Sequence, residues 1–191
     1  YRVPRIGFVN KMDRQGSNFL AVCQQVRDML KSNAVAITLP IGEENDFKGV
    51  VDLVRNQAIV WDDAGMGATY EVVEIPADMV DQANEYRQKM LDAVAEFDDQ
   101  VMEKYINGQP LSEEEVRRVV RAGTIAMKVV PVLCGSAFKN KGVQQLLDGV
   151  VDFLPSPVDI PPVIGVDPNT SKEVERRPSD SEPFSALAFK I

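Results

Sequence analysis

The sequence predicts an α/β fold, a doubly wound sheet interrupted by an inserted α+β subdomain. Two observations support this prediction. An apolar strand, a polar loop and an amphipathic helix follow one another twice, in residues 5–30 and again in residues 129–154. Between these units the apolar positions of residues 34–128 first alternate, as in strands, and then recur every three or four residues, as in helices.

The first unit starts with a predicted buried strand, Arg5 to Val9, that ends in the polar loop 10–14. A helix is expected from about Ser17, because apolar residues between Phe19 and Leu30 recur at helical spacing. In doubly wound sheets, ligands bind at the carboxyl ends of the strands. We therefore expect the loop of this unit to meet the corresponding loop of the second unit.

The inserted segment begins with several short β-like runs and a candidate turn at Asn56. These runs are residues 35–41, 50–54, 58–61 and 70–75. Residues 77–106 then predict one long continuous helix, since apolar positions recur along the whole segment at helical spacing. Ser112 and Glu115 form a capping box ahead of a shorter helix.

The second unit has a short apolar run, Val129 to Cys134, that suits a strand buried on both faces. It is followed by the polar loop 136–141 and a last amphipathic helix. Five prolines between Pro155 and Pro168 then predict an extended linker. Because Tyr1 is not an initiator and apolar strand-like runs lie at both ends, we expect a fragment truncated at both ends.

The composition restricts the classes of function. The chain of 191 residues contains no histidine, which excludes Ser/His/Asp and Cys/His catalysis and histidine-ligated metal sites. The net charge of -8 argues against broad, unspecific binding to nucleic acid, because such binding needs Lys and Arg to neutralise phosphates.

Cys23 and Cys134 lie far apart in apolar surroundings, which favours a reducing, cytoplasmic location over a disulfide framework. No apolar run approaches the roughly 18 residues of a membrane span.

The loop Asn10-Lys11-Met12-Asp13 has the residue types that recognise guanine. The Asp13 carboxylate can accept two parallel hydrogen bonds from the ring N1–H and the exocyclic amino group, which adenine does not offer. Asn10 can bond the N7 edge, and the methylene stem of Lys11 can cover one face of the ring. Turns also contain Asn-Lys-x-Asp by chance. The position of this loop between a strand and a helix, with a second Ser-Ala loop downstream, favours the guanine interpretation.

These loops resemble the fourth and fifth guanine-binding motifs of bacterial elongation factor G. The resemblance rests on Asn10-Lys11-Met12-Asp13-Arg14 and on Gly135-Ser136-Ala137-Phe138-Lys139-Asn140-Lys141-Gly142. It covers essentially the whole chain, since that family has a large insert between these motifs and a proline-rich exit into a β-barrel domain. It implies part of a P-loop GTPase sheet, and a parent that uses GTP to drive tRNA and mRNA translocation on the ribosome. The nucleotide-binding residues it implies are Asn10, Lys11, Met12, Asp13, Ser136, Ala137 and Phe138.

The resemblance also implies a domain organisation. Residues 1–33 are expected to form part of the G domain with the Asn-Lys-x-Asp loop, and residues 34–128 the inserted subdomain. Residues 129–155 are expected to form the G-domain part with the Ser-Ala loop and the last helix. Residues 156–191 are expected to be the linker and the start of a β-barrel domain.

One part of the family pattern does not occur here. The sequence holds no Gly-x-x-x-x-Gly-Lys-Ser/Thr loop, so it offers GTP or GDP only the base-contacting half of a site and offers Mg²⁺ no ligands. We therefore assign no catalytic or metal-binding residue and expect no hydrolysis by this chain alone. Two alternatives stay open. One is a non-catalytic protein-interaction module, and the other is a fragment of release factor three, a ribosomal protection factor or mitochondrial elongation factor G.

The segment 77–106 is strongly acidic, with eight Asp and Glu residues against three Lys and Arg. A solvated helix face explains most such patterns. The resemblance implies a further role, because in elongation factor G the corresponding insert is expected to meet the ribosomal stalk protein. The candidate docking residues are Glu85, Asp92 and Glu96. The edge of the first strand additionally predicts self-association of the chain.

Overall fold

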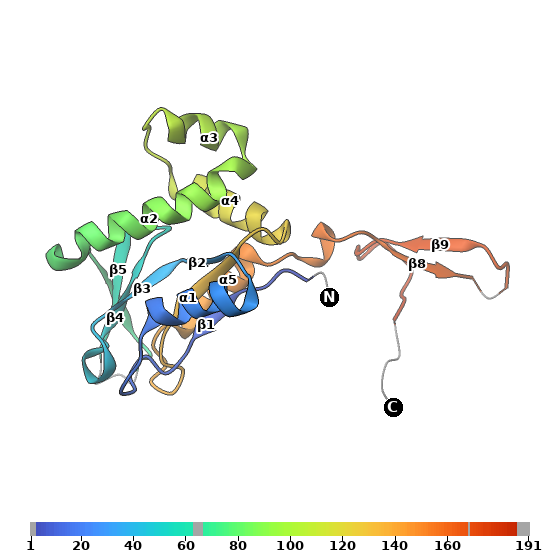
Figure 1. Cartoon of the computed structure of the whole chain (residues 1–191). Helices are drawn as coiled ribbons and strands as arrows, with labels where there is room; N and C mark the ends of the chain where they lie inside the picture. The colour runs from blue at the N-terminus through green and yellow to red at the C-terminus, as the bar shows by residue number, and fades with distance from the viewer. Residues whose placement is uncertain (1–2, 63–66, 168, 187–191) are drawn as a thin grey trace. The chain divides into compact units, whose positions relative to one another are not determined.

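The computed structural model describes residues 3–62, 67–167 and 169–186 (Figure 1). The chain divides into two compact units, Tyr1–Leu154 and Pro155–Ile191. The larger unit has the predicted α/β fold with a parallel sheet, and it holds both polar loops.

The parallel sheet of the larger unit contains β1 (Gly7–Val9), β7 (Val130–Cys134) and β2 (Ala34–Ala36), in the order β1-β7-β2. Val9 is paired with Cys134, so β1 and β7 end side by side at one edge. The prediction of a buried first strand was wrong, because β1 is half-buried. Its position explains the exposure: among the described residues β7 is its only neighbour, so β1 is an edge strand.

Two helices follow these strands. Helix α1 (Phe19–Leu30) begins after Asn18, whose side-chain oxygen accepts a hydrogen bond from the Ala21 amide and caps the first turn. It packs on β2 through the buried side chains of Phe19 and Cys23. Helix α5 (Val143–Phe153) follows β7 and packs on β7 and on helix α4 (Glu113–Ile125). Helix α1 begins two residues after the predicted start near Ser17, and α5 follows the second polar loop as predicted.

The inserted segment starts with an antiparallel meander in the order β3-β4-β5-β6. Its strands are β3 (Thr38–Ile41), β4 (Gly49–Asp52), β5 (Gln57–Trp61) and β6 (Tyr70–Val73). Asn56 has a φ of 55° in the tight turn between β4 and β5, a conformation that Asn tolerates well. Only Ile37 separates β2 from β3, and its amide donates to the Val132 carbonyl (2.9 Å). The insert is therefore continuous with the parallel sheet.

The helical part of the insert differs from the prediction. In place of one helix over residues 77–106 there are α2 (Val80–Val94) and α3 (Asp99–Ile106), with 3₁₀ turns at Ala77–Met79 and Ala95–Phe97. Asp98 separates the two helices with extended backbone, and its carboxylate accepts hydrogen bonds from the Gln100 and Val101 amides. Asp98 is thus the N-cap of a new helix.

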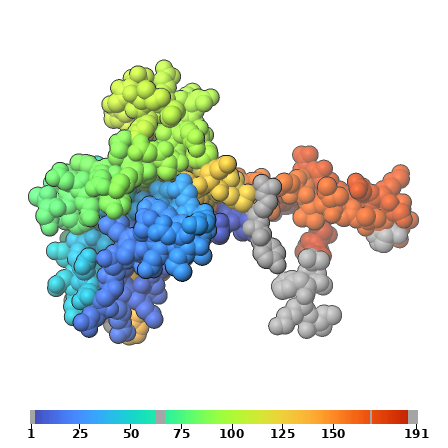
Figure 2. Space-filling model, viewed as in Figure 1, coloured from blue at the N-terminus to red at the C-terminus, as the bar shows by residue number. Residues whose placement is uncertain are grey.

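Helix α4 (Glu113–Ile125) starts with the predicted capping box of Ser112 and Glu115. Buried valines on one side of this helix, among them Val116 and Val120, join the core shared by both sheets. In Figure 2 the insert helices lie at the surface of the larger unit, which leaves their acidic residues accessible to solvent.

The smaller unit contains a 3₁₀ turn, Pro157–Asp159, and an antiparallel hairpin of β8 (Val163–Val166) and β9 (Glu173–Arg176). Strand β8 lies inside the segment predicted as an extended linker. Its residues follow Pro161 and Pro162, so neither proline removes a ladder hydrogen bond. Across the described part of the chain, none of the helices combines the length and apolar character required to span a bilayer.

Candidate functional site

Loops 10–14 and 136–141 extend from the neighbouring ends of β1 and β7, and hydrogen bonds join them. The Gly135 amide donates to the Val9 carbonyl (3.1 Å), and the Met12 amide donates to the Gly135 carbonyl (3.1 Å). The Ala137 amide donates to Oδ1 of Asn10 (2.9 Å). The first loop is thus held against the second by backbone and side-chain contacts.

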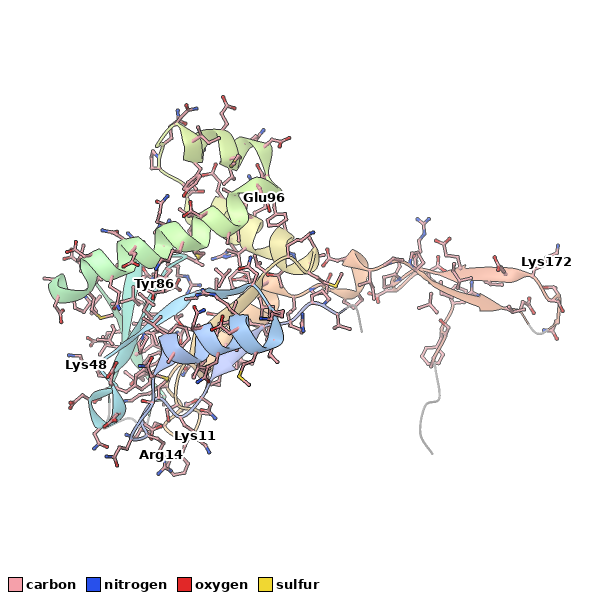
Figure 3. The ribbon with its side chains drawn as sticks, viewed as in Figure 1. Lys11, Arg14, Lys48, Tyr86, Glu96 and Lys172 are labelled. Carbon is pink, nitrogen blue, oxygen red and sulfur yellow. The ribbon has the colours of Figure 1, made fainter. Side chains whose placement is uncertain are left out.

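Asn10 also shapes its own loop. Its Oδ1 accepts a second hydrogen bond from the Lys11 amide (2.8 Å). Lys11 has a φ of 64°, in the left-handed region, and its side chain is exposed. The next side chain, Met12, is only 1% exposed. Met12 therefore anchors the loop in the core while Asn10 and Lys11 remain at the surface, and Figure 3 shows Lys11 and Arg14 at this end of the larger unit.

The Asp13 carboxylate lies between the two loops. Its side chain is 8% exposed, and Lys139 Nζ is 3.9 Å from its Oδ2. The Ser136 hydroxyl has the largest influence and lowers the pKa of Asp13 below the ordinary value of 3.8, against the opposing effect of burial. The charges of Lys139 and Arg14 lower this pKa further. Asp13 is therefore an ionised, acceptor-only group at neutral pH.

The hydroxyl of Ser136 is a buried polar group of the second loop. Ser136 is 1% exposed, yet its hydroxyl oxygen makes no hydrogen bond of ordinary geometry with the described residues. Of the causes that lower the pKa of Asp13, the Ser136 hydroxyl is nevertheless the largest. We infer from both facts that Ser136 faces Asp13 without a well-formed bond. A buried hydroxyl in this state retains its capacity to donate.

The second loop is a tight turn. Ser136 and Lys141 exchange two backbone hydrogen bonds of 2.9 and 3.0 Å, and Asn140 adopts a left-handed φ of 55°. A Cβ on Gly135 would lie 2.3 Å from the Lys141 carbonyl oxygen, so the turn closes only with glycine there. Phe138, at the tip, is 91% exposed. A flat apolar ring is thus presented to solvent beside the polar groups of the site.

The structure brings most of the predicted site residues together. Asn10 contacts Ala137 directly, and Asp13 is next to Ser136. Met12 takes part through its backbone, since its side chain is buried. The basic neighbours Arg14 and Lys139 were not among the predicted residues, although their positions beside the two motifs could have indicated them. Among the described residues, no group of three or more His, Cys, Asp or Glu side chains is arranged to hold a metal ion.

The three predicted docking residues on and after α2 are exposed but differ in their contacts. Glu85 is paired with Lys89 one turn later, and Asp92 accepts a hydrogen bond from the Tyr105 hydroxyl of α3. The Glu96 side chain makes no hydrogen bond or ion pair with the described residues. Figure 3 shows Glu96 at the other end of the larger unit from Lys11 and Arg14. The acidic face is therefore separate from the two polar loops.

Known proteins are similar to this chain in sequence and in fold. The family of the elongation factor Tu GTP binding domain matches residues 1–156. The chain is 56% identical over 192 residues to the elongation factor G of Cytophaga hutchinsonii. The match spans 100% of this chain but only 27% of the length of that relative. A crystal structure of a protein from Thermus thermophilus has a TM-score of 0.69 and 25% identity, over 90% of this chain and 26% of that one. The chain belongs to the elongation factor Tu GTP-binding domain family.

Proposed function

We propose that this chain supplies the guanine-recognition half of the nucleotide site in a translation elongation factor. The parent protein would bind and hydrolyse GTP in the cytoplasm to drive tRNA and mRNA translocation on the ribosome. The match to a GTP-binding domain and the 56% identity to an elongation factor G support this proposal. The alternative of a free-standing interaction module has no comparable support.

The observation that carries the proposal is the pairing of the two loops. Asn10 fixes the first loop to the Ala137 amide of the second, and the nearly buried Asp13 carboxylate lies between them. An ionised carboxylate in this position would accept two hydrogen bonds from the Watson–Crick edge of guanine. The backbone amides of Ala137 and Phe138 would serve the O6 carbonyl, with the Ala137 amide shared between the base and Asn10.

The exposed side chains suit the two faces of a flat base. Lys11 and the ring of Phe138 are both exposed, one in each of the two loops that Asn10 and Ala137 join. Covering a purine between an alkyl chain and an aromatic ring removes apolar area from water and adds stacking energy. The polar groups would then provide specificity, and these two side chains would provide affinity.

The chain alone is expected to bind nucleotide weakly. Two hydrogen bonds to a charged group contribute about 3 to 6 kcal/mol together. Immobilising the ligand costs about 4 to 15 kcal/mol. Without a loop for the phosphates, we expect millimolar affinity at best and no hydrolysis. The phosphates and Mg²⁺ would be held by other residues of the parent.

Exchanging Asp13 for Asn tests the base assignment. In Asp13→Asn an amide N–H replaces an acceptor, which opposes guanine but matches the C2 carbonyl of xanthine. In the intact factor we expect GDP affinity to fall roughly 100-fold or more and xanthosine diphosphate affinity to rise, since two charge-assisted bonds are lost. Competition binding of both nucleotides measures the ratio. An unchanged preference for guanine would refute the role of Asp13.

The acidic face of the insert is proposed to dock a basic partner, in the parent the ribosomal stalk protein. The support is the exposure of Glu85, Asp92 and Glu96, and the Glu96 side chain makes no hydrogen bond or ion pair with the described residues. We also propose that the isolated chain self-associates through the edge of β1, since an unpaired strand edge is a template for another strand.

A further inference from the structure

Loops of the inserted meander reach back to both proposed base-binding loops. The first contact involves Glu44, in the 3₁₀ turn Glu44–Asp46 between β3 and β4. Its Oε1 accepts a hydrogen bond of 2.7 Å from the Gly16 amide. Gly16 lies three residues after Asp13, in the segment between the Asn-Lys-x-Asp loop and α1. The insert therefore holds the C-terminal side of the first loop.

A second contact comes from the same connection between β3 and β4 and holds the Ser-Ala loop. The carbonyl of Phe47, the residue that follows the 3₁₀ turn, accepts a hydrogen bond of 3.1 Å from Lys141 Nζ. Lys141 is only 2% exposed, and Phe47 only 1%. A buried ammonium group is costly unless polar groups surround it. The position of this insert loop is thus tied to the end of the Ser-Ala loop.

The third contact comes from the connection between β5 and β6. The Gly67 carbonyl accepts hydrogen bonds from Gln144 Nε2 (3.1 Å) and Asn140 Nδ2 (3.4 Å). A Cβ on Gly67 would lie 2.2 Å from the Lys139 carbonyl oxygen, so the two backbones are in close contact. The Ser-Ala loop is therefore supported by two different loops of the insert.

The backbone of Glu44 is unfavourable for its residue type. Its φ of 52° lies in the left-handed region, where the Cβ of a residue comes too close to the following carbonyl oxygen. Non-glycine residues in this region are mostly Asn, Asp or His. Such strain persists where surrounding contacts fix it, and it is enriched at functional sites. Here the bond to the Gly16 amide is the contact that the strained turn makes with the first loop.

We propose that Glu44, Phe47 and Gly67 form an insert clamp that holds the two base-binding loops in position and so sets how long a guanine nucleotide stays bound. Glu44 is then a positioning residue, since it acts on the base through Gly16 and the adjoining loop 10–14. This inference rests on the proposed function of the two loops. The insert thereby gains a role in nucleotide retention, distinct from the acidic face on α2.

The clamp is tested by the dissociation rate of a GDP carrying a fluorescent ribose label, measured by stopped flow on the intact factor. Glu44→Ala removes the acceptor for the Gly16 amide, and we expect dissociation to be roughly 3- to 10-fold faster. Glu44→Gln keeps an acceptor oxygen and should restore most of the retention. Glu43→Ala is the matched control, because the Glu43 side chain is exposed and makes no hydrogen bond or ion pair with the described residues.

Equal rates for Glu44→Ala and Glu43→Ala would overturn the clamp. So would equal acceleration by Glu44→Ala and Glu44→Gln, since the effect would then follow charge and not the hydrogen bond. Asp13→Asn in the same assay distinguishes this failure from that of the proposed function, because it tests the base contact directly. If Glu44→Ala fails to fold, Gly67→Ala replaces it. Its Cβ would push the insert loop from Lys139, so faster release is expected and an unchanged rate would again overturn the clamp.

Discussion

Arg121 provides a test of how the last helix, and with it the Ser-Ala loop, is held in place. Its Nη1 donates to three carbonyls at the C-terminal end of α5, those of Val151 (3.4 Å), Asp152 (3.1 Å) and Leu154 (2.7 Å). The last carbonyls of a helix have no partner within it, and a positive charge there also favours the helix dipole. Arg121 thus attaches α5 to α4.

The cost of removing this side chain can be estimated from its bonds. A hydrogen bond from a charged donor contributes about 1.5 to 3 kcal/mol, and only the two shorter contacts have good distances. Because the side chain is partly exposed, solvent screening reduces this contribution. Arg121→Ala should therefore lower the free energy of unfolding by about 2 to 3 kcal/mol. For a unit of this size each kcal/mol shifts Tm by about 2 to 4 °C. We therefore expect a decrease of roughly 4 to 12 °C, measured by calorimetry.

Arg118, one turn earlier on α4, is the matched control. Its Nε lies 2.9 Å from the Asp98 carboxylate, but the Arg118 side chain is 47% exposed. An ion pair at the surface contributes little, so Arg118→Ala should leave Tm nearly unchanged. Similar decreases for the two variants would refute the reasoning, because charge loss from α4 would then explain both. An unchanged Tm for Arg121→Ala would show that the carbonyls of α5 are equally well satisfied by water.

Two further predictions concern the proposed sites. Glu96→Lys reverses the charge of the docking residue whose side chain makes no hydrogen bond or ion pair with the described residues. It should slow ribosome-stimulated GTP turnover of the intact factor while leaving intrinsic GDP affinity unchanged. An unaffected stimulated rate would show that this face is only solvated. The pKa of Asp13 lies below 3.8 in the folded chain. The contribution of the ionised carboxylate to GDP binding is therefore complete above the ordinary pKa of 3.8, and it is lost as pH falls through the lower, folded pKa. GDP affinity should therefore be flat from about pH 8 to about pH 5, and a midpoint near neutrality in a binding titration would contradict this.

Local patterns predicted the units that carry the candidate site. The strand, loop and helix at each end of the larger unit follow from apolar periodicity, and the capping box at Ser112 follows from two residues three apart. The meeting of the two loops also followed from sequence, because adjacent parallel strands bring their carboxyl ends to one edge. Asn10 and Ala137 are 127 residues apart, and this rule, together with the resemblance to the two guanine-binding motifs, predicted that their loops meet.

The errors arose where a local pattern was consistent with two structures. Apolar spacing continues from Met90 through Phe97 to Val101, so periodicity showed no break at Asp98. The signal was instead Asp98 itself, an N-cap residue type at the point where a new helix begins.

The insert clamp had no sequence signal at all. The bond from Gly16 to Glu44 and the contact of Gly67 with Lys139 depend on how the meander folds back on the sheet. That arrangement is a tertiary property, set by the shared core of the two sheets rather than by the residues at the loop tips.

Guanine recognition by the two loops is tested most directly by an NMR titration of this chain with GMP and, separately, with AMP at millimolar concentrations. We expect the backbone amides of Lys11, Asp13 and Ala137 to shift with GMP and to stay unchanged with AMP. Equal shifts with both nucleotides, or shifts confined to residues outside loops 10–14 and 136–141, would contradict guanine recognition by these loops.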